Sequence, residues 1–271
     1  MDVHNKEQRR IVTHDHTALP APNVVLPIVG PPFERADSAL IAQLHAVSSA
    51  TASAILHKLG LRRAFIQGPT TRRPGAKVVG TAITLQFMPQ REDIASGLNQ
   101  EYSEKKSALW AVLEAVQPGD VLAVQAYADP YTGCFGEMLL SYFKGRRGAA
   151  IVVDGYLRDW ARIEELAVPV WARGTTPNYA SQANLYPWAY NVPISCGGVL
   201  VLPGDIIIAD DDGAVLLPLK AAPTVLQHTL EHEDWEGFSR MRLAEGGALQ
   251  TYYPLSKAGR QEYEEWLRSR R

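Results

Sequence analysis

The sequence has few cysteines, no long apolar run and no excess of charge of either sign. Only two cysteines occur in its 271 residues, Cys134 and Cys196, which are too few for a disulfide framework and lack the C-x-x-C spacing of a redox or zinc site. The 27 Lys and Arg residues nearly balance the 29 Asp and Glu residues. A net charge of −2 gives no electrostatic reason to expect a nucleic acid or an anionic membrane as partner, and the cysteine usage suits a reducing cytoplasm.

We also find no segment in the sequence that is typical of a secretion signal or of membrane insertion. The first residues, MDVHNKEQRRIV, are charged and lack the apolar core of a signal peptide. The longest uncharged stretch, residues 174–204, contains four prolines among Asn, Gln and Ser residues. We interpret this stretch as irregular chain and expect no membrane span in it.

Several catalytic and cofactor motifs cannot be found. There is no G-x-S-x-G nucleophile motif, no P-loop and no G-x-G-x-x-G sequence opening a helix after the first strand. The pattern therefore offers no cradle for a nucleotide or a methyl-donor cofactor. Cys134 has no histidine in its own segment, so we interpret it as a small packing residue.

The apolar pattern predicts an α/β protein. With 46% hydrophobic residues the chain can bury a core. Apolar residues that recur at intervals of three and four residues predict two helices between residues 34 and 61. The segments expected next are a strand at 78–87, a helix at about 105–116, a strand at 121–127, a helix ending at Lys144, a strand at 149–155, a helix at about 159–166 and a strand at 168–174. Residues 199–218 predict a β meander, and residues 222–244 a long helix followed by a Gly-Gly break and a charged helix.

Two turns at the carboxyl ends of neighbouring apolar runs are the candidate sites. In TGCFGEML, a glycine-rich turn leads into a helix whose N-terminal N–H groups favour a carboxylate or phosphate, although a tight turn that binds nothing has the same pattern. In VVDGYLRD, a buried strand delivers Arg158 and Asp159 to a helix start, where the ordinary reading is a helix cap beside a solvated arginine. Because ligands usually bind at this edge of α/β sheets, we expect the two turns together to outline a site for a metal ion and a carboxylate.

Other polar clusters favour structural roles. His228 and His232 have the spacing of two metal ligands on a helix, but acidic neighbours and the lack of a third ligand favour a solvated face. The run Asp210 to Gly213 joins two apolar runs without the spacing of a calcium loop, so it predicts a hairpin turn.

Seven segments, in this order along the chain, resemble the RraA-like family, which includes regulators of RNase E activity and class II 4-hydroxy-4-methyl-2-oxoglutarate / 4-carboxy-4-hydroxy-2-oxoadipate aldolases. They are VSSATASAILHKLG, VVGTAITL, QPGDVLAV, GEML, IVVDGYLRD, VPVWARGTTP and VPISCGGVLVLPGDIIIADDDGAVLLP, and they span residues 47–218. The resemblance implies a three-layer ββα swivelling-domain sandwich, assembled as a homotrimer or hexamer with sites at subunit interfaces. On this basis we divide the chain into an N-terminal arm (1–33), a catalytic domain (34–220) and a C-terminal helical extension (221–271), the arm wrapping a neighbour or being partly disordered.

The resemblance also implies roles for single residues. Aldolase members carry an acidic residue, twenty intervening residues and then Arg-Asp, a pattern that Glu137, Arg158 and Asp159 meet, with Glu in place of the commoner Asp. In the ribonuclease regulators the acidic position is typically Gly, so Glu137 favours an enzyme. An acidic residue usual three positions after the Asp is Arg162 here, and Glu164 or Glu165 are candidates to replace it.

The expected activity is a metal-dependent retro-aldol cleavage of a 4-hydroxy-2-oxo acid to pyruvate and a second carbonyl compound, with oxaloacetate decarboxylation as a side activity. Asp159 would hold Mg²⁺ or Mn²⁺, Arg158 would neutralise the enolate, and Glu137 would orient or deprotonate a water on the ion. The backbone of Gly136, Glu137, Met138 and Leu139 would clamp the substrate carboxylate. Selectivity for the part of the substrate far from the 2-oxo group would come from Arg91, Asn99, Tyr186 or Trp188. The alternative function is that of a non-catalytic regulator that binds a ribonuclease.

Overall fold

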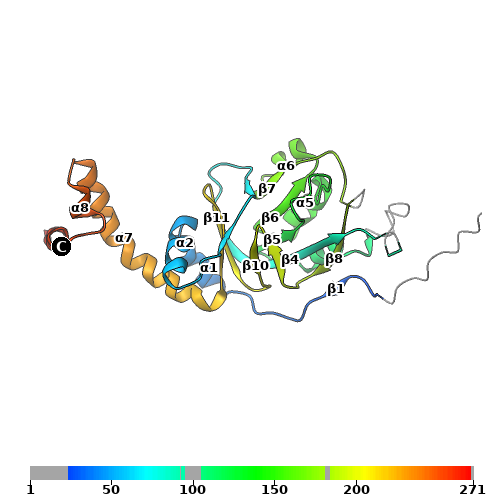
Figure 1. Cartoon of the computed structure of the whole chain (residues 1–271), viewed down its shortest axis with the longest axis horizontal. Coiled ribbons are helices and arrows are strands. Elements are labelled where there is room, and N and C mark those ends of the chain that lie inside the picture. Colours follow the sequence, from blue (N-terminus) through cyan, green and yellow to red (C-terminus); the bar gives the residue numbers. More distant parts are fainter. Residues whose placement is uncertain (1–23, 92, 95–104, 181–183, 270–271) are drawn as a thin grey trace, which may run out of the picture.

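A computed structural model describes residues 24–91, 93–94, 105–180 and 184–269, without the side chains of 231–234 (Figure 1). The helices are α1 (Ser38–Leu44), α2 (Ser49–Lys58), α4 (Ala108–Ala115), α5 (Glu137–Gly145), α6 (Trp160–Leu166), α7 (Ala222–Ala244), α8 (Leu249–Tyr252) and α9 (Lys257–Ser269), with a 3₁₀ turn at Leu219–Ala221. The strands are β1 (Ile28–Val29), β2 (Phe65–Ile66), β3 (Thr70–Thr71), β4 (Val78–Pro89), β5 (Asp120–Gln125), β6 (Ala150–Leu157), β7 (Val170–Thr175), β8 (Leu185–Tyr190), β9 (Ile194–Cys196), β10 (Val199–Val201), β11 (Ile206–Asp210) and β12 (Gly213–Leu217).

Four parallel strands form the centre of a ten-stranded sheet. Its main path runs β2-β12-β11-β4-β5-β6-β7-β3, with β4, β5, β6 and β7 parallel and β8 paired to the outer half of β4. These central strands are apolar runs because both of their faces are covered. The alternation of strand and helix predicted over residues 78–175 is therefore confirmed.

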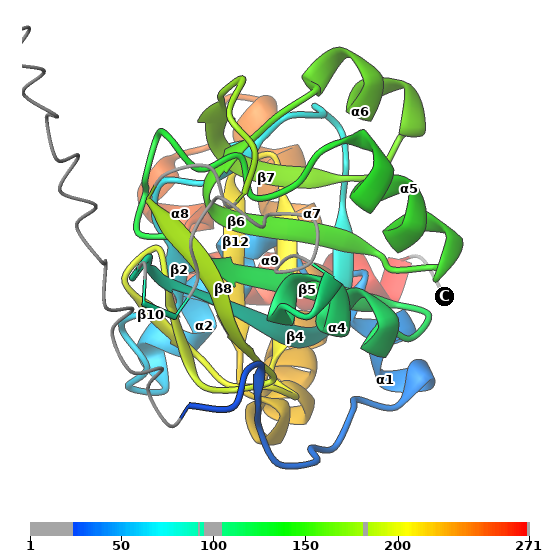
Figure 2. The ribbon, with the colours of Figure 1, turned by 90° about the vertical axis from the view of Figure 1, so that its right-hand side faces the viewer.

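Side chains of alternate strand positions enter two different cores, as the pleat requires. On one face, Leu122 and Val153 pack with α4, α5 and α6 (Figure 2). On the other, Val121 and Val152 pack with the β9–β10 pair. Helices, main sheet and small second sheet make the three layers expected of the ββα sandwich.

The predictions for residues 174–218 need two corrections. The uncharged stretch is not irregular, because it contains β8, β9 and β10. Pro187 is accommodated inside β8 at a register shift, where Phe87 pairs with Pro187 while Gln86 pairs with Ala189, so the strand skips one residue. The prediction of a β meander is also wrong, because consecutive strands do not all pair with each other. Strand β10 pairs with β9, whereas β11 lies between β12 and β4. The predicted hairpin turn between Asp210 and Gly213 is confirmed.

The two predicted N-terminal helices are α1 and α2, and both begin at side-chain caps. Asp37 accepts a hydrogen bond from the Ala39 N–H group and Ser48 from that of Thr51. They share a third core with β11, β12 and the beginning of α7.

The predicted long helix is α7, which extends away from the sheet beyond these contacts and carries α8 and α9 at its far end (Figure 1). Buried Phe238 contacts the rings of Tyr252, Tyr263 and Trp266 there. Of the expected N-terminal arm, residues 1–23 lie outside the described chain, and β1 pairs with β8.

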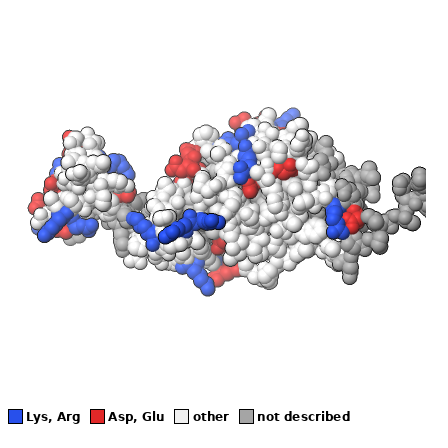
Figure 3. Space-filling view, viewed as in Figure 1, with Lys and Arg blue, Asp and Glu red and all other residues white. Residues whose placement is uncertain are grey.

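Among the described residues, no single helix is long and apolar enough to cross a membrane. The pair α1 and α2, which is bent by 100°, reaches the length and composition of a membrane span only when the two helices are taken together. On the face drawn in Figure 3, Lys and Arg residues lie at separate places with Asp and Glu residues near several of them.

Candidate active site

The two candidate turns lie side by side because backbone hydrogen bonds join them. Gly133 forms a parallel bridge with Tyr156 at the end of β6, and the Cys134 N–H group donates to the Tyr156 carbonyl at 2.8 Å. The Arg158 N–H group then donates to the Phe135 carbonyl at 3.0 Å. The segment before α5 thus continues the sheet for a few residues beside β6, which brings the start of α5 next to Arg158 and Asp159.

Two glycines allow this close approach. A Cβ atom on Gly133 would lie 2.2 Å from the carbonyl oxygen of Asn178, and a Cβ atom on Gly136 would lie 2.6 Å from Oδ2 of Asp159. Real side-chain carbons do not approach other atoms this closely, so a larger residue at Gly133 would push against the backbone of Asn178, and one at Gly136 would displace the carboxylate of Asp159. The glycines of the TGCFGEML turn are therefore a packing requirement of the site.

Arg158 and Asp159 form an ion pair at the start of α6. Asp159 has a left-handed backbone (φ 60°), which Asp tolerates better than most residues, and this turn directs its carboxylate back towards the arginine. Arg158 Nε donates to Asp159 Oδ2 at 3.0 Å, and the two side chains are 36% and 40% exposed. Asp159 occupies the N-cap position of α6, but its carboxylate accepts no hydrogen bond from the first turn of the helix. Asp159 therefore does not act as a side-chain cap. A half-exposed pair contributes little to stability, which leaves both groups available to a ligand.

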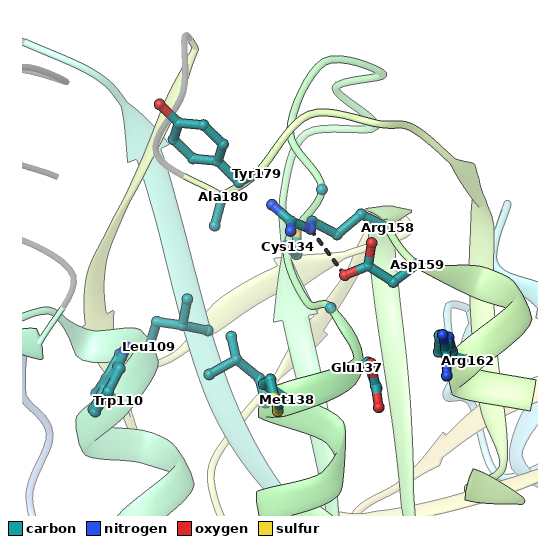
Figure 4. Close-up of a pocket in the computed structure, with 13 residues that line it drawn as sticks. Leu109, Trp110, Cys134, Glu137, Met138, Arg158, Asp159, Arg162, Tyr179 and Ala180 are labelled. Carbon is teal, nitrogen blue, oxygen red and sulfur yellow. Dashed lines mark hydrogen bonds and ion pairs between the residues drawn. The ribbon is translucent and has the colours of Figure 1, made fainter. Parts of the chain in front are cut away.

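Both turns line one open cavity of about 620 Å³. The lining residues are Leu109, Trp110, Gly133, Cys134, Gly136, Glu137, Met138, Leu139, Arg158, Asp159, Arg162, Tyr179 and Ala180. Figure 4 shows the guanidinium of Arg158 directed towards Tyr179 and Ala180, whereas the carboxylate of Glu137 points away from Arg158. The residues predicted to act in catalysis, to clamp the substrate carboxylate or to hold the metal all line this cavity, and their roles remain predictions: they are Gly136, Glu137, Met138, Leu139, Arg158 and Asp159.

The side chains that line the cavity can be compared with those that bind Mg²⁺ or Mn²⁺ in proteins. Within the described chain, no three His, Cys, Asp or Glu residues are grouped closely enough to hold a metal by themselves. Asp159 and Glu137 nevertheless both line the cavity, and carboxylate oxygen is the donor that Mg²⁺ and Mn²⁺ prefer. Since Mg²⁺ is commonly bound by one or two carboxylates and keeps several waters, these residues fit a partly hydrated ion.

Several cavity residues were not predicted from the sequence. Trp110 comes from α4, and Tyr179 from the loop after β7. The rule that ligands bind beyond the carboxyl ends of parallel strands would have pointed to that loop, because β7 is the strand next to β6.

Of the four residues predicted to select the distal part of a substrate, three are described, and none of these three lines the cavity. Arg91 pairs with Asp93 at 2.6 Å, and neither it, half-buried Trp188 nor buried Tyr186 is among the described residues that line the cavity. Asn99 lies outside the described residues. Tyr186 and Trp188 belong to β8, and Arg91 follows the end of β4, so the cavity lining does not support a distal role for these three residues, while the role of Asn99 stays a prediction.

The remaining polar candidates have structural partners or lie outside the described part. Asp210 accepts hydrogen bonds from the Ser49 N–H group at 2.8 Å and the Ser49 hydroxyl at 2.5 Å, and thereby anchors the start of α2. Cys134 is buried in the core, as the packing interpretation requires, and burial raises the pKa of its thiol. The side chain of His232 is not among those described, and no described metal cluster includes His228.

Comparison with known proteins identifies the family of the chain. The family model described as RraA-like, Aldolase/RraA, matches residues 43–216. The chain belongs to the RraA-like family. Its sequence relatives include a protein of Halalkalibacterium halodurans, named provisionally as a 4-hydroxy-4-methyl-2-oxoglutarate aldolase, which is 37% identical over 151 residues. The match covers 56% of this chain and 64% of that relative, so the chain spans slightly less than two thirds of its length.

Solved structures with the RraA-like fold include RraAS2 of Streptomyces coelicolor, described as an unusual member of the RNase ES inhibitor RraA protein family. It is 57% identical, with a TM-score of 0.72, and the match covers 78% of this chain and all of that one. An uncharacterised protein of Pseudomonas syringae pv. tomato, 20% identical, has a TM-score of 0.67 over 81% of this chain and 99% of its own. The second likeness concerns the fold alone.

Proposed function

We propose that this RraA-like protein is a divalent-metal-dependent carbon–carbon lyase, which cleaves a 4-hydroxy-2-oxo acid to pyruvate and a second carbonyl compound and decarboxylates oxaloacetate as a side activity. The observation that carries the proposal is the junction at Gly136, which brings the first turn of α5 and the Arg158–Asp159 pair to one cavity. The aldolase name of the Halalkalibacterium halodurans relative supports the same reaction class.

Arg158 and the start of α5 provide complementary binding for a 2-oxo acid. The first N–H groups of a helix have no intrahelical acceptor and carry partial positive charge, so those of α5 suit the substrate carboxylate. Only Nε of Arg158 is engaged among the described residues, which leaves its terminal nitrogens for the 2-oxo group. There the guanidinium stabilises the negative charge that develops as the pyruvyl fragment becomes an enolate.

Glu137 is the group proposed to move the proton. Cleavage removes a proton from the 4-hydroxyl group and delivers one to the enolate carbon, so a carboxylate beside the substrate is needed. Glu137 begins α5, lines the cavity and makes no hydrogen bond to another described side chain. It is therefore free to accept and return the proton.

Asp159 is the residue proposed to hold Mg²⁺ or Mn²⁺, with Glu137 as the second carboxylate on the cavity. Oδ2 of Asp159 receives the hydrogen bond of Arg158, while Oδ1 makes no hydrogen bond within the described chain. When bound, the ion supplies Lewis-acid stabilisation of charge on the substrate oxygen.

Substitutions at these residues test the proposal through pyruvate release from oxaloacetate and from a panel of 4-hydroxy-2-oxo acids with added Mg²⁺. Arg158→Ala and Asp159→Ala should each lower kcat by about 100-fold or more, as loss of one charge-stabilising group does. Asp212→Ala removes an exposed carboxylate from the β11–β12 turn and serves as the control without effect. Rates that stay unchanged after EDTA treatment would exclude the metal-dependent reaction.

Mn²⁺ binding, followed by electron paramagnetic resonance, separates the two carboxylates. Asp159→Ala should lose the bound ion, whereas Glu137→Gln should keep it and lose turnover, because its assigned role is proton transfer. Equal loss of Mn²⁺ in both variants would make Glu137 a direct ligand and overturn its assignment.

A second candidate function is binding and inhibition of a ribonuclease, which the 57% identity to RraAS2 of the RNase ES inhibitor family favours. The test is to titrate purified protein against an RNase E-type enzyme and measure both binding and RNA cleavage. Stoichiometric binding together with no turnover of any 2-oxo acid would favour the regulator over the lyase.

Self-association as a trimer or hexamer belongs to the same proposal. Light scattering on the full chain after size-exclusion chromatography should give three or six times the 29.8 kDa of one chain. A monomer at micromolar concentration would contradict this part.

A further inference from the structure

The carboxylate of Asp129, in the loop after β5, links two segments that are far apart in the sequence. It accepts hydrogen bonds from the hydroxyl of Thr132 and, at 3.4 Å, from the N–H group of Tyr131. The side-chain amide of Asn184, which directly precedes β8, donates to the same carboxylate at 3.0 Å. Asp129 therefore uses both of its oxygens to hold its own loop and the segment before β8 together.

Each of the linked segments continues into the cavity lining. Buried Thr132 is followed at once by Gly133, where the parallel bridge to the end of β6 brings the chain towards α5. Asn184 comes shortly after the Tyr179–Ala180 wall of the cavity in the chain. Figure 4 shows the guanidinium of Arg158 directed towards this wall. The link therefore joins the segment that leads to α5 with the segment that follows the wall.

The turn that carries Asp129 has a strained backbone. Tyr127 and Ala128 are both left-handed, with φ 53° and 55°, although neither is glycine. Such residues persist where surrounding contacts hold them, and they gather at functional sites. Here the Ala128 N–H group donates to the Asp154 carbonyl at 2.9 Å, and the Tyr127 hydroxyl donates to Sδ of Met88 at 3.2 Å. These contacts hold the turn in one conformation, so the position of Asp129 is fixed from its own side of the link.

We propose that Asp129 is a positioning residue for the lyase reaction: its pairing with Asn184 fixes the Tyr179–Ala180 wall opposite the 2-oxo acid end of the cavity. This inference rests on the proposed lyase function. Asp129 does not line the cavity, and both of its oxygens accept hydrogen bonds from the protein, so it takes no part in proton transfer or metal binding. Its contribution is to keep that end of the cavity at one width, because a bound substrate reacts only when its surroundings hold it in the productive geometry.

Exchanging the two partners tests the inference, because the exchanged pair can form the same contacts. Asp129→Asn brings two amide donors face to face, since the new amide can accept from Thr132 but not also from Asn184. Asn184→Asp brings two carboxylates together, which repel each other. In the double variant the amide at position 129 accepts from Thr132 and donates to the carboxylate at position 184, so both side-chain hydrogen bonds of the link are restored.

Binding and turnover should respond differently from metal affinity. Each single variant should lower kcat/KM for pyruvate release by about 10-fold, less than a full 1 Å displacement costs, and should weaken pyruvate binding in calorimetry with Mg²⁺ present. The double variant should return to within about threefold of wild type, because the two changes are coupled. Mn²⁺ binding, followed by electron paramagnetic resonance, should stay unchanged in all three variants, since Asp159 lies at the start of α6 and makes no printed contact with the link.

Two further variants separate this role from a general loss of structure. Asn184→Ala breaks the link at an exposed side chain and should show the same loss of pyruvate binding as the single exchanges. Asp211→Asn is the matched control, because the Asp211 carboxylate also joins two loops, accepting from the Gly75 N–H group at 2.9 Å, but does not line the cavity. It should leave pyruvate release unchanged.

The outcomes distinguish the inference from the function on which it rests. If wild type neither releases pyruvate from any 2-oxo acid nor binds it, the lyase proposal fails and the role of Asp129 fails with it. If wild type is active but the single variants match it, or the double variant is impaired as much as both singles together, the lyase stands and Asp129 is not a positioning residue.

Discussion

Replacing Gly136 by alanine tests the convergence of the two turns with the smallest possible change. Gly136 has an extended backbone (φ −116°, ψ −177°) that alanine adopts freely, so the added methyl group acts only through its contacts. That methyl would lie 2.6 Å from Asp159 Oδ2 and 3.3 Å from Arg158 Nε. To reach the 3.4 Å at which ordinary contact begins, the Asp159 carboxylate must withdraw by about 0.8 Å.

The expected effect on activity is large and the effect on folding small. A displacement of about 1 Å at a reacting centre costs on the order of 100-fold in rate, so Gly136→Ala should lose about this factor in pyruvate release. The displaced pair is 36% and 40% exposed and can move into solvent. We therefore expect the free energy of unfolding to fall by about 1 kcal/mol, at the low end for overpacked sites.

The assay pairs pyruvate release with thermal unfolding, and Gly145→Ala is the matched control at the other end of the same helix. An added Cβ atom at Gly145 meets nothing within 4 Å, so this variant should keep wild-type rates and gain up to about 1 kcal/mol from reduced backbone entropy in the unfolded chain. Wild-type turnover by Gly136→Ala would refute the reasoning, because the reaction would then not depend on where Asp159 lies.

Two further predictions concern the thiols of the two buried cysteines and the carboxyl group of Asp205. Burial raises the pKa of the Cys196 thiol to about 12, and that of the buried Cys134 thiol is raised as well, so neither should react with iodoacetamide at pH 8 until the protein is unfolded in guanidinium chloride. Fast alkylation of either thiol in the native protein would contradict the structure. Burial also raises the pKa of Asp205 above 3.8, so the stability that its protonation contributes is present below about pH 3.8 and lost as the pH rises through the folded-state pKa. Asp205→Asn keeps an acceptor for the Leu202 N–H group, which lies at 2.9 Å, and should raise Tm at pH 7 but not at pH 3; an equal change at both pH values would contradict the shift.

Features that depend on residues close together in the chain could be predicted from the sequence. The bounds of α7, the caps that start α1 and α2, and the strand–helix alternation up to β7 follow from apolar periodicity and from Ser, Asp, Gly and Pro at element ends. The adjacency of Arg158 and Asp159 at a helix start is of the same kind. The expectation that both candidate turns lie at one sheet edge needed only the rule that neighbouring parallel strands end together.

Features that depend on distant pairing were decided by the tertiary structure. Strand β4 is twelve residues long, and one of its edges pairs with β11 at residues 78–81 and with β8 at residues 85–89, so an uncharged, proline-containing stretch becomes a strand. The direction of Glu137, and the presence of Trp110 and Arg162 on the cavity, likewise follow from how α4, α5 and α6 pack on the sheet, and Tyr179 reaches the cavity from the loop after β7. Local sequence determines which residues can form a helix, a strand or a turn, whereas the partners of a strand edge and the direction of a side chain are set by contacts between segments far apart in the chain.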